Sequence, residues 1–93
     1  MIIWEGIRMG KKDKLIRKIK SRPKDFTFDE AVTLLEYFNY VMCNKGKTSG
    51  SRVMFAHKTN NTNILLHKPH PRKELLDYQI KQLVKFLEQE GHI

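Results

Sequence analysis

The spacing of hydrophobic residues predicts a basic helix near the start of the chain. Residues 10–21 are cationic except for a narrow apolar stripe at helical spacing, formed by Leu15, Ile16 and Ile19. Pro23 stands shortly after this stretch, and the residue before a proline avoids the helical backbone conformation. The predicted helix therefore ends before Arg22.

Two further stretches have helical spacing. In residues 26–38, Thr27 stands three positions before Glu30, which is the spacing of an N-terminal capping box. The apolar positions that follow are Phe28, Ala31, Val32, Leu34, Leu35 and Phe38. A last helix is predicted from about Asp77, with Gly91 placed to end it. Its apolar positions are Ile80, Leu83, Val84 and Leu87.

Between these helices the pattern is typical of strands. Residues 40–45 form a short apolar run, residues 52–58 alternate, and residues 63–67 follow the turn sequence Thr-Asn-Asn-Thr. The alternation places Val53, Phe55 and His57 on one face, and Arg52, Met54 and Ala56 on the other. The order predicts an α+β fold, α-β-β-β-α after the basic helix. Two helices would cover one face of a three-stranded antiparallel sheet and leave the other face bare.

The length of 93 residues suits one small domain. We interpret residues 1–9 as an N-terminal extension, since a second methionine precedes the basic helix, and residues 10–93 as a single domain with its core in 26–93. The single cysteine, Cys43, lies in an apolar run and is interpreted as a small buried hydrophobe in a reducing compartment. No apolar run approaches the roughly 20 residues that cross a bilayer. We therefore expect a cytoplasmic protein that does not bind membranes.

Positive charge is concentrated in two segments. The net charge is +8; residues 8–24 hold nine Lys or Arg and one acid, and residues 45–73 hold seven and none. This segregation favours a polyanionic partner, nucleic acid first. The competing interpretation is a solvated basic surface.

The hairpin between the second and third strands predicts where the polar residues lie. If its turn is centred on Asn60-Asn61, Met54 opposes His67 and Arg52 opposes Pro69. Arg52 and His67 then become diagonal neighbours on the bare face, about 7–8 Å apart. A register slip of one residue would separate them.

The other histidines are given different roles. His57 shares a face with hydrophobic residues and is interpreted as a histidine at the edge of the core. His70 stands between two prolines and is expected to be exposed, and His92 is expected to be frayed at the chain end. The four histidines lack the close pairing of a zinc site, so neither a metal nor a cofactor is predicted.

Three sequences, in this order, carry a family resemblance: GSRVMF at 50–55, LHKPHP at 66–71 and YQIKQLVKFLEQEG at 78–91. Over about residues 26–93 the chain resembles HicA-type toxins, the mRNA interferases of bacterial and archaeal toxin–antitoxin systems. The resemblance implies a fold like that of double-stranded-RNA-binding domains. It also implies a cytosolic endoribonuclease that cleaves mRNA and is neutralised by a HicB-type antitoxin.

The chain departs from the family pattern at one position. The family places its catalytic histidine directly after a Gly-Ser pair; here Gly50 and Ser51 match, but Arg52 follows. Arginine cannot exchange a proton at ordinary pH, although its planar fork suits a phosphate. Our hypothesis is that Arg52 binds the scissile phosphate while His67, or else His70, transfers the proton.

The flanking RNA backbone would be held by cations and by a turn. Backbone amides of the Gly46–Gly50 turn, together with Ser51, present N–H and O–H groups to anions. The proposed cations are Lys45, Lys47, Lys68, Arg72 and Lys73.

The sequence leaves three interpretations open. The chain is an active toxin, a disabled RNA-binding module of the same fold, or a protein-interaction module that docks an acidic antitoxin. Arg52 is either the natural state of a subgroup or an inactivating change. The helix at 10–21 extends the RNA track, packs on the domain or contacts the antitoxin.

Overall fold

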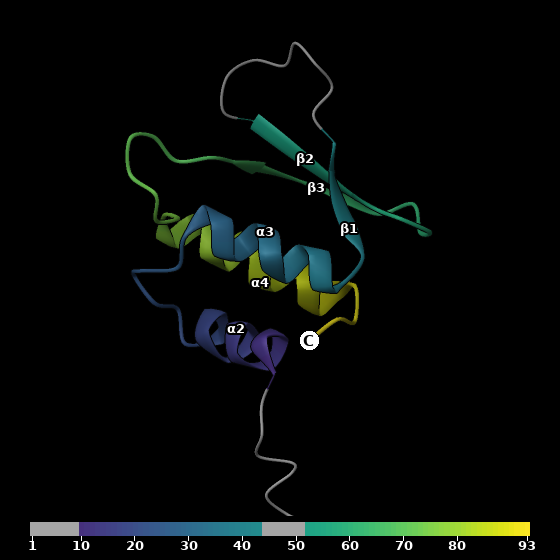
Figure 1. Cartoon of the computed structure of the whole chain (residues 1–93), viewed down its shortest axis with the longest axis horizontal. Helices are drawn as coiled ribbons and strands as arrows, with labels where there is room; N and C mark the ends of the chain where they lie inside the picture. Colours follow the sequence, from purple (N-terminus) through teal and green to yellow (C-terminus); the bar gives the residue numbers. More distant parts are fainter. Residues whose placement is uncertain (1–9, 44–51) are drawn as a thin grey trace, which may run out of the picture.

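A computed structural model describes residues 10–43 and 52–93. Its elements are α2 (Lys11–Lys20), α3 (Phe28–Tyr37), β1 (Tyr40–Cys43), β2 (Arg52–His57), β3 (Asn63–His67) and α4 (Asp77–Gln89) (Figure 1). The strands form one antiparallel sheet in the order β1-β2-β3. The predicted α+β fold is confirmed. The first strand was predicted to reach residue 45, but residues 44 and 45 lie outside the described residues.

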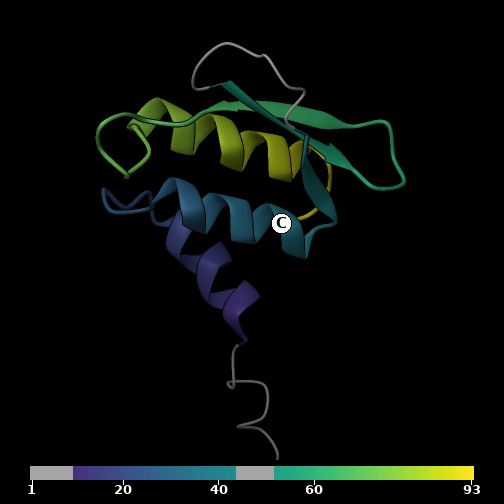
Figure 2. The same cartoon turned by 45° about the horizontal axis from the view of Figure 1, so that its top comes forward.

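The elements lie in three layers. Helices α3 and α4 cover one face of the sheet, and no helix in the described residues covers the other (Figures 1 and 2). Helix α2 packs across α3 and α4 on the side away from the sheet (Figure 2). The basic helix therefore packs on the domain, which was one of the three roles left open for it.

The capping box at the start of α3 is confirmed and also anchors α2. The Glu30 backbone N–H donates to Thr27 Oγ1 at 3.1 Å, and the Thr27 N–H donates to Glu30 Oε1 at 2.9 Å. The Glu30 carboxylate also accepts from Lys18 of α2, with 3.0 Å between Nζ and Oε2. The Glu30 side chain therefore caps the start of α3 and also binds α2 to it.

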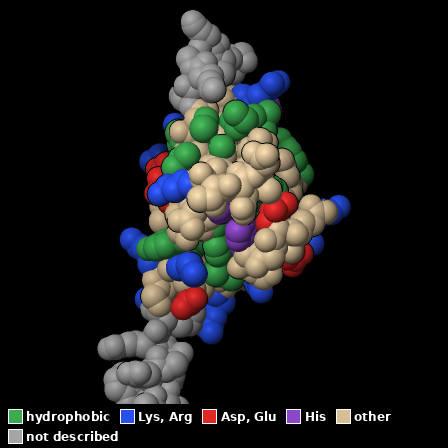
Figure 3. All heavy atoms as spheres, turned by 90° about the vertical axis from the view of Figure 1, so that its right-hand side faces the viewer, with side chains coloured by type: hydrophobic (Ala, Val, Ile, Leu, Met, Phe, Trp, Pro, Cys, Tyr) green, Lys and Arg blue, Asp and Glu red, His purple; other side chains and the backbone are tan. Residues whose placement is uncertain are grey.

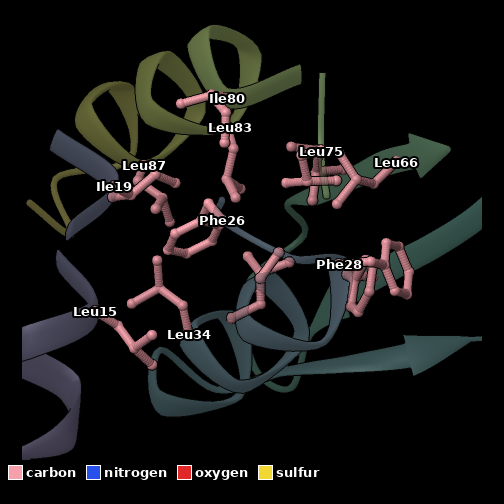
Figure 4. Close-up of a cluster of buried hydrophobic side chains, with 14 of the residues drawn as sticks. Leu15, Ile19, Phe26, Phe28, Leu34, Leu66, Leu75, Ile80, Leu83 and Leu87 are labelled. Carbon is pink, nitrogen blue, oxygen red and sulfur yellow. The ribbon is translucent and has the colours of Figure 1, made fainter. Parts of the chain in front are cut away.

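The core is built around a phenylalanine in the connection between α2 and α3. Phe26 is 0% exposed, and its ring lies between Leu34 of α3 and Leu83 and Leu87 of α4 (Figure 4). Helix α2 adds Leu15 and Ile19 to the same cluster. The remaining buried hydrophobic residues are Phe28, Ala31, Leu35, Phe38, Tyr40, Phe55, Ile64, Leu66, Leu75 and Ile80.

Residues 68–76, between β3 and α4, form a proline-rich segment. Backbone hydrogen bonds fix this segment to the start of α3. The Phe28 N–H donates to Lys73 O at 3.0 Å, and the Leu75 N–H donates to Phe26 O at 2.8 Å. Thr27 and Glu74 form an isolated antiparallel bridge between these bonds. Residues 68–76 form no helix and no strand of the sheet, since prolines disrupt both.

The predicted hairpin register is wrong by two residues. Arg52 opposes His67 instead of Pro69, and Met54 opposes Leu65 instead of His67. The His57 N–H donates to Thr62 O at 3.0 Å, which leaves a loop of residues 58–61.

The ring of His57 explains the longer loop. Its Nδ1 accepts from the N–H groups of Thr59 and Asn60, both at 3.1 Å, so these amides turn toward a side chain instead of pairing across the hairpin. His57 lies at the edge of the core, as expected, with its ring edge-on to Tyr40 at 4.9 Å. A shift of two residues keeps every side chain on its predicted face.

His92 was expected to be frayed, and this is wrong. Gly91 has a φ of 76°, which turns the chain back so that the His92 N–H donates to Leu87 O at 2.9 Å. The His92 ring stacks on Phe38 at 4.8 Å, and its Nε2 lies 3.0 Å from Tyr40 Oη. Figure 3 looks onto this end of the molecule, where histidine side chains reach the surface. Burial, and the ring of His57 at 6.1 Å, lower the pKa of His92, while Glu90 acts in the opposite sense.

Replacing Ile19 with alanine tests whether α2 is part of the fold. Ile19 is 0% exposed, so Ile19→Ala should reduce the free energy of unfolding by about 2–5 kcal/mol in chemical denaturation. Arg17→Ala, on the exposed side of the same helix, should change it by no more than about 0.5 kcal/mol. Equal effects of the two substitutions would contradict the packing of α2.

The contacts of His92 predict a dependence of stability on pH. Its pKa is held below the ordinary 6.5 in the folded chain, so the unfolded chain binds the proton more readily. The contribution to stability is therefore complete above about pH 6.5 and falls as pH decreases through that value. Unfolding followed from about pH 8 to about pH 5 should show a weaker acid destabilisation for His92→Gln. His70→Gln, at an exposed histidine, is the control and should behave like the parent.

Candidate functional site

Arg52 and His67 are direct partners across β2 and β3. The His57–Thr62 pair is hydrogen-bonded, and such pairs alternate along an antiparallel ladder, so Arg52 and His67 form a non-hydrogen-bonded pair. Residues in such a pair have Cα atoms about 4.5 Å apart and their side chains close together. The structure therefore brings the two predicted residues nearer than the diagonal arrangement expected from sequence.

Arg52 and His67 lie on the face of the sheet that no described helix covers, here called the uncovered face. Their neighbours along the strands pack on the opposite face, against the helices. Val53 and Leu66, the next pair along, point to the helices, and Leu66 is fully buried. Alternation then turns Arg52 and His67 outward, where both are exposed. A guanidinium and an imidazole at this spacing are placed to contact one phosphate group from the same side.

A buried glutamine of α4 holds the backbone of His67. Gln79 is 2% exposed, its Nε2 donates to His67 O at 2.7 Å, and its Oε1 accepts from the Leu76 N–H at 2.9 Å. Both ends of one amide are therefore satisfied, by the end of β3 and the start of α4. Because the Gln79 side chain is buried, these two bonds fix the position of β3 relative to α4 at the residue that precedes the proline-rich segment, His67.

Sequence reasoning missed Gln79, although a signal was present. Gln79 is next to Ile80 on the core-facing side of α4, where a polar residue needs partners. It stands three positions after Leu76, the place of the Glu or Gln in a capping box, but the leucine hides the pattern.

The predicted residues after His67 gather around a hollow of about 200 Å³. Its walls come from the start of α3 and from the proline-rich segment, and are formed by Thr27, Phe28, Asp29, Lys68, Pro69, His70, Pro71, Arg72 and Lys73. Lys68 Nζ lies 5.8 Å above the Phe28 ring, a cation–π contact. Arg72 is partly engaged, because its Nε donates to Glu74 O at 3.1 Å. Three cations beside the positive end of α3 make the hollow attractive to an anion, with Asp29 opposing them.

The remaining predicted residues are not placed. Lys45, Lys47, Ser51 and the Gly46–Gly50 turn lie outside the described residues, so their contribution to the site stays a prediction. His70 lines the hollow, whereas His67 stands beside Arg52.

The uncovered face of the sheet is apolar beside the Arg52–His67 pair. Cys43, Met54 and Leu65 lie side by side across the three strands, and Val41 and Ala56 lie in the next row. Val41 is 39% exposed and Leu65 is 41% exposed. Cys43 was interpreted as a small buried hydrophobe but is only half-buried, because no helix in the described residues covers this face. Contiguous exposed apolar residues of this kind mark an interaction site.

Residues 10–43 and 52–93 contain neither a metal-binding cluster nor a membrane-spanning helix. Within these ranges no group of three or more His, Cys, Asp or Glu residues is arranged to hold a metal ion. Within the same ranges no helix has the length and apolarity to cross a membrane.

Comparison with known proteins identifies a family. A family model described as the HicA toxin of bacterial toxin–antitoxin systems matches residues 28–91. This match covers α3, the three strands and α4, and begins after α2. No curated protein and no solved structure matched the chain.

Substitution of Gln79 should loosen the junction between β3 and α4. Gln79→Leu leaves the His67 carbonyl and the Leu76 amide without partners, so the free energy of unfolding should fall by about 1–3 kcal/mol. Hydrogen exchange of the Leu76 amide should accelerate. Gln82→Leu, which removes an exposed contact of 3.3 Å to Leu65 O, is the matched control and should cost less. Unchanged exchange at Leu76 in Gln79→Leu would contradict this role.

Proposed function

We infer the activity of this chain from the premise that it belongs to the HicA toxin family of bacterial toxin–antitoxin systems, whose model matches more than half of its residues. The chain is accordingly the toxin partner of an antitoxin. We propose that it acts in the cytoplasm as an endoribonuclease that cleaves mRNA without a metal ion. The observation that carries this proposal is the direct opposition of Arg52 and His67 on the uncovered face of the sheet.

The two side chains suit different parts of one reaction. His67 takes the proton from a ribose 2′-OH, whose oxygen then attacks the adjacent phosphorus. The Arg52 guanidinium donates hydrogen bonds to the non-bridging oxygens of the phosphate and neutralises the negative charge that develops on them in the transition state. The bond to the 5′-oxygen breaks, and that oxygen takes a proton from water. The products are a 2′,3′-cyclic phosphate and a 5′-OH, and His67 returns its proton to solvent.

The hollow beside the pair supports the neighbouring part of the RNA. Lys68 and Lys73 supply positive charge there, and His70 is the second candidate proton carrier. Lys45, Lys47 and Ser51, which lie outside the described residues, remain proposed contacts to the RNA backbone. Arg72 is a weaker candidate than the lysines, because Glu74 already holds its Nε.

The apolar part of the uncovered face favours a second function for the same surface. We propose that a HicB-type antitoxin docks over Val41, Met54 and Leu65, and so covers Arg52 and His67. An apolar centre with a polar rim is typical of a protein interface. A pure protein-interaction module would use this surface without binding RNA, which separates it from the nuclease.

Cleavage of a labelled mixed-sequence RNA in EDTA tests the nuclease. Arg52→Ala and His67→Ala should each reduce the rate by about 100-fold or more, since each removes a group that acts in the transition state. Lys58→Ala, an exposed cation in the hairpin loop, should leave the rate unchanged. Lys73→Ala should mainly weaken RNA binding and reduce its salt dependence.

Two outcomes would contradict the proposed division of labour. Cleavage by His67→Ala at the parental rate would show that another group carries the proton, and His70→Ala would then identify it. Cleavage that appears only after Arg52→His would show a disabled nuclease whose remaining activity is binding.

A further inference from the structure

A basic groove lies between α2 and α4 on the helical side of the molecule. It encloses about 650 Å³ and is lined by Lys20, Arg22, Lys81, Val84, Lys85 and Glu88. Four cations face one carboxylate across it. We call this the α2–α4 groove.

The packing of the two helices holds these cations in place. Ile19 is fully buried, so the end of α2 is fixed and the neighbouring Lys20 is exposed beside α4. Lys81 and Lys85 stand one turn apart on α4, and therefore on the same face. Lys81 pairs with Asp77 at 3.4 Å, but both side chains are more than half exposed, and such a pair contributes little. Most of the positive charge of the groove is thus available to a partner.

The basic surface continues around α2. A second hollow, of about 420 Å³, is lined by Lys14, Arg17, Lys18 and Ser21. These residues recur at helical spacing, and the hollow has no acidic side chain in its lining. Lys18 is engaged by Glu30, which leaves Lys14 and Arg17 as its open cations. Basic residues of α2 therefore line both hollows.

The composition of the groove favours RNA over a protein. The centre of a protein interface is depleted in lysine and needs apolar area, whereas the only aliphatic residue in this lining is the half-buried Val84. Interfaces with nucleic acid are more polar and much more positively charged. The apolar surface that suits a protein lies instead on the uncovered face of the sheet.

We propose that the α2–α4 groove binds the phosphate backbone of RNA at a second site, separated from Arg52 and His67 by the layer of α3 and α4. The family match begins at residue 28, so two of the six lining residues, Lys20 and Arg22, lie outside the matched region. The proposal rests on RNA being the polyanion on which this toxin acts. Its role is to hold a long RNA while a different part of that RNA reaches the uncovered face.

The test compares two triple variants that remove the same charge. The groove variant is Lys20→Gln, Arg22→Gln and Lys85→Gln; the control is Lys11→Gln, Lys24→Gln and Lys58→Gln, all at exposed positions outside the groove. Glutamine removes the charge and has a helix propensity close to that of lysine and arginine. Affinity for a mixed-sequence single-stranded RNA, long enough to reach both faces, is measured by fluorescence anisotropy over a range of salt concentrations.

The groove variant should bind the long RNA at least about tenfold more weakly, and the slope of log K against log salt should become shallower by about 2, as three lost phosphate contacts predict. The control should change both quantities much less. Equal losses in the two variants would overturn the groove as a site, because total charge would explain them. Full RNA affinity in the groove variant, with weaker binding of the cognate antitoxin, would overturn RNA as its occupant.

Cleavage of a short RNA that covers only the Arg52–His67 pair separates this proposal from the nuclease. The groove variant should cleave it at the parental rate, and a large loss there would place the three cations in the catalytic site and overturn a second site. If the chain cleaves no RNA at all, the proposed nuclease fails, while the anisotropy comparison still decides the groove.

Discussion

The fold depends on a short piece of backbone pairing between residues 26–28 and 73–75. Two hydrogen bonds, from Phe28 to Lys73 and from Leu75 to Phe26, join the start of α3 to the segment that leads into α4. Phe26, Phe28 and Leu75, which lie next to these bonds, are buried in the core and hold the two segments together. The pairing closes the connection from β3 to α4. It thereby sets the walls of the hollow that holds the predicted cations.

The positions of Arg52 and His67 are well defined because both residues lie in strands and not in the proline-rich segment that follows β3. Arg52 and His67 belong to strands, and the residues next to them are packed against the helices. Gln79 adds a buried link from α4 to the backbone of His67. The backbone position of His67 is therefore determined by residues of the core. The proline-rich segment carries the residues that would hold flanking phosphates, and these need less exact positions than the residues that act on the reacting phosphate.

The elements could be predicted from sequence where the signal was local. The spacing of Thr27 and Glu30 predicts a capping box, and the alternation in 52–57 predicts which face of the sheet each side chain occupies. The hairpin register could not be predicted in the same way, because the His57 ring accepts two turn amides and lengthens the loop. His92 and Gln79 were missed for a related reason. Their partners, Tyr40 and His67, are 52 and 12 residues away, and only the folded chain brings them together.

The glutamines of α4 also affect how the sheet meets other chains. The carbonyls of Leu65 and His67 face away from β2, at the outer edge of β3, and Gln82 and Gln79 each donate to one of them. An edge strand normally offers such carbonyls as a template for a foreign strand. Here a strand added beside β3 would have to displace two side-chain amides, one of them buried. The edge of the sheet next to His67 is therefore protected against strand addition and against the fibrous self-association that follows from it, while no helix of the described residues protects its flat face.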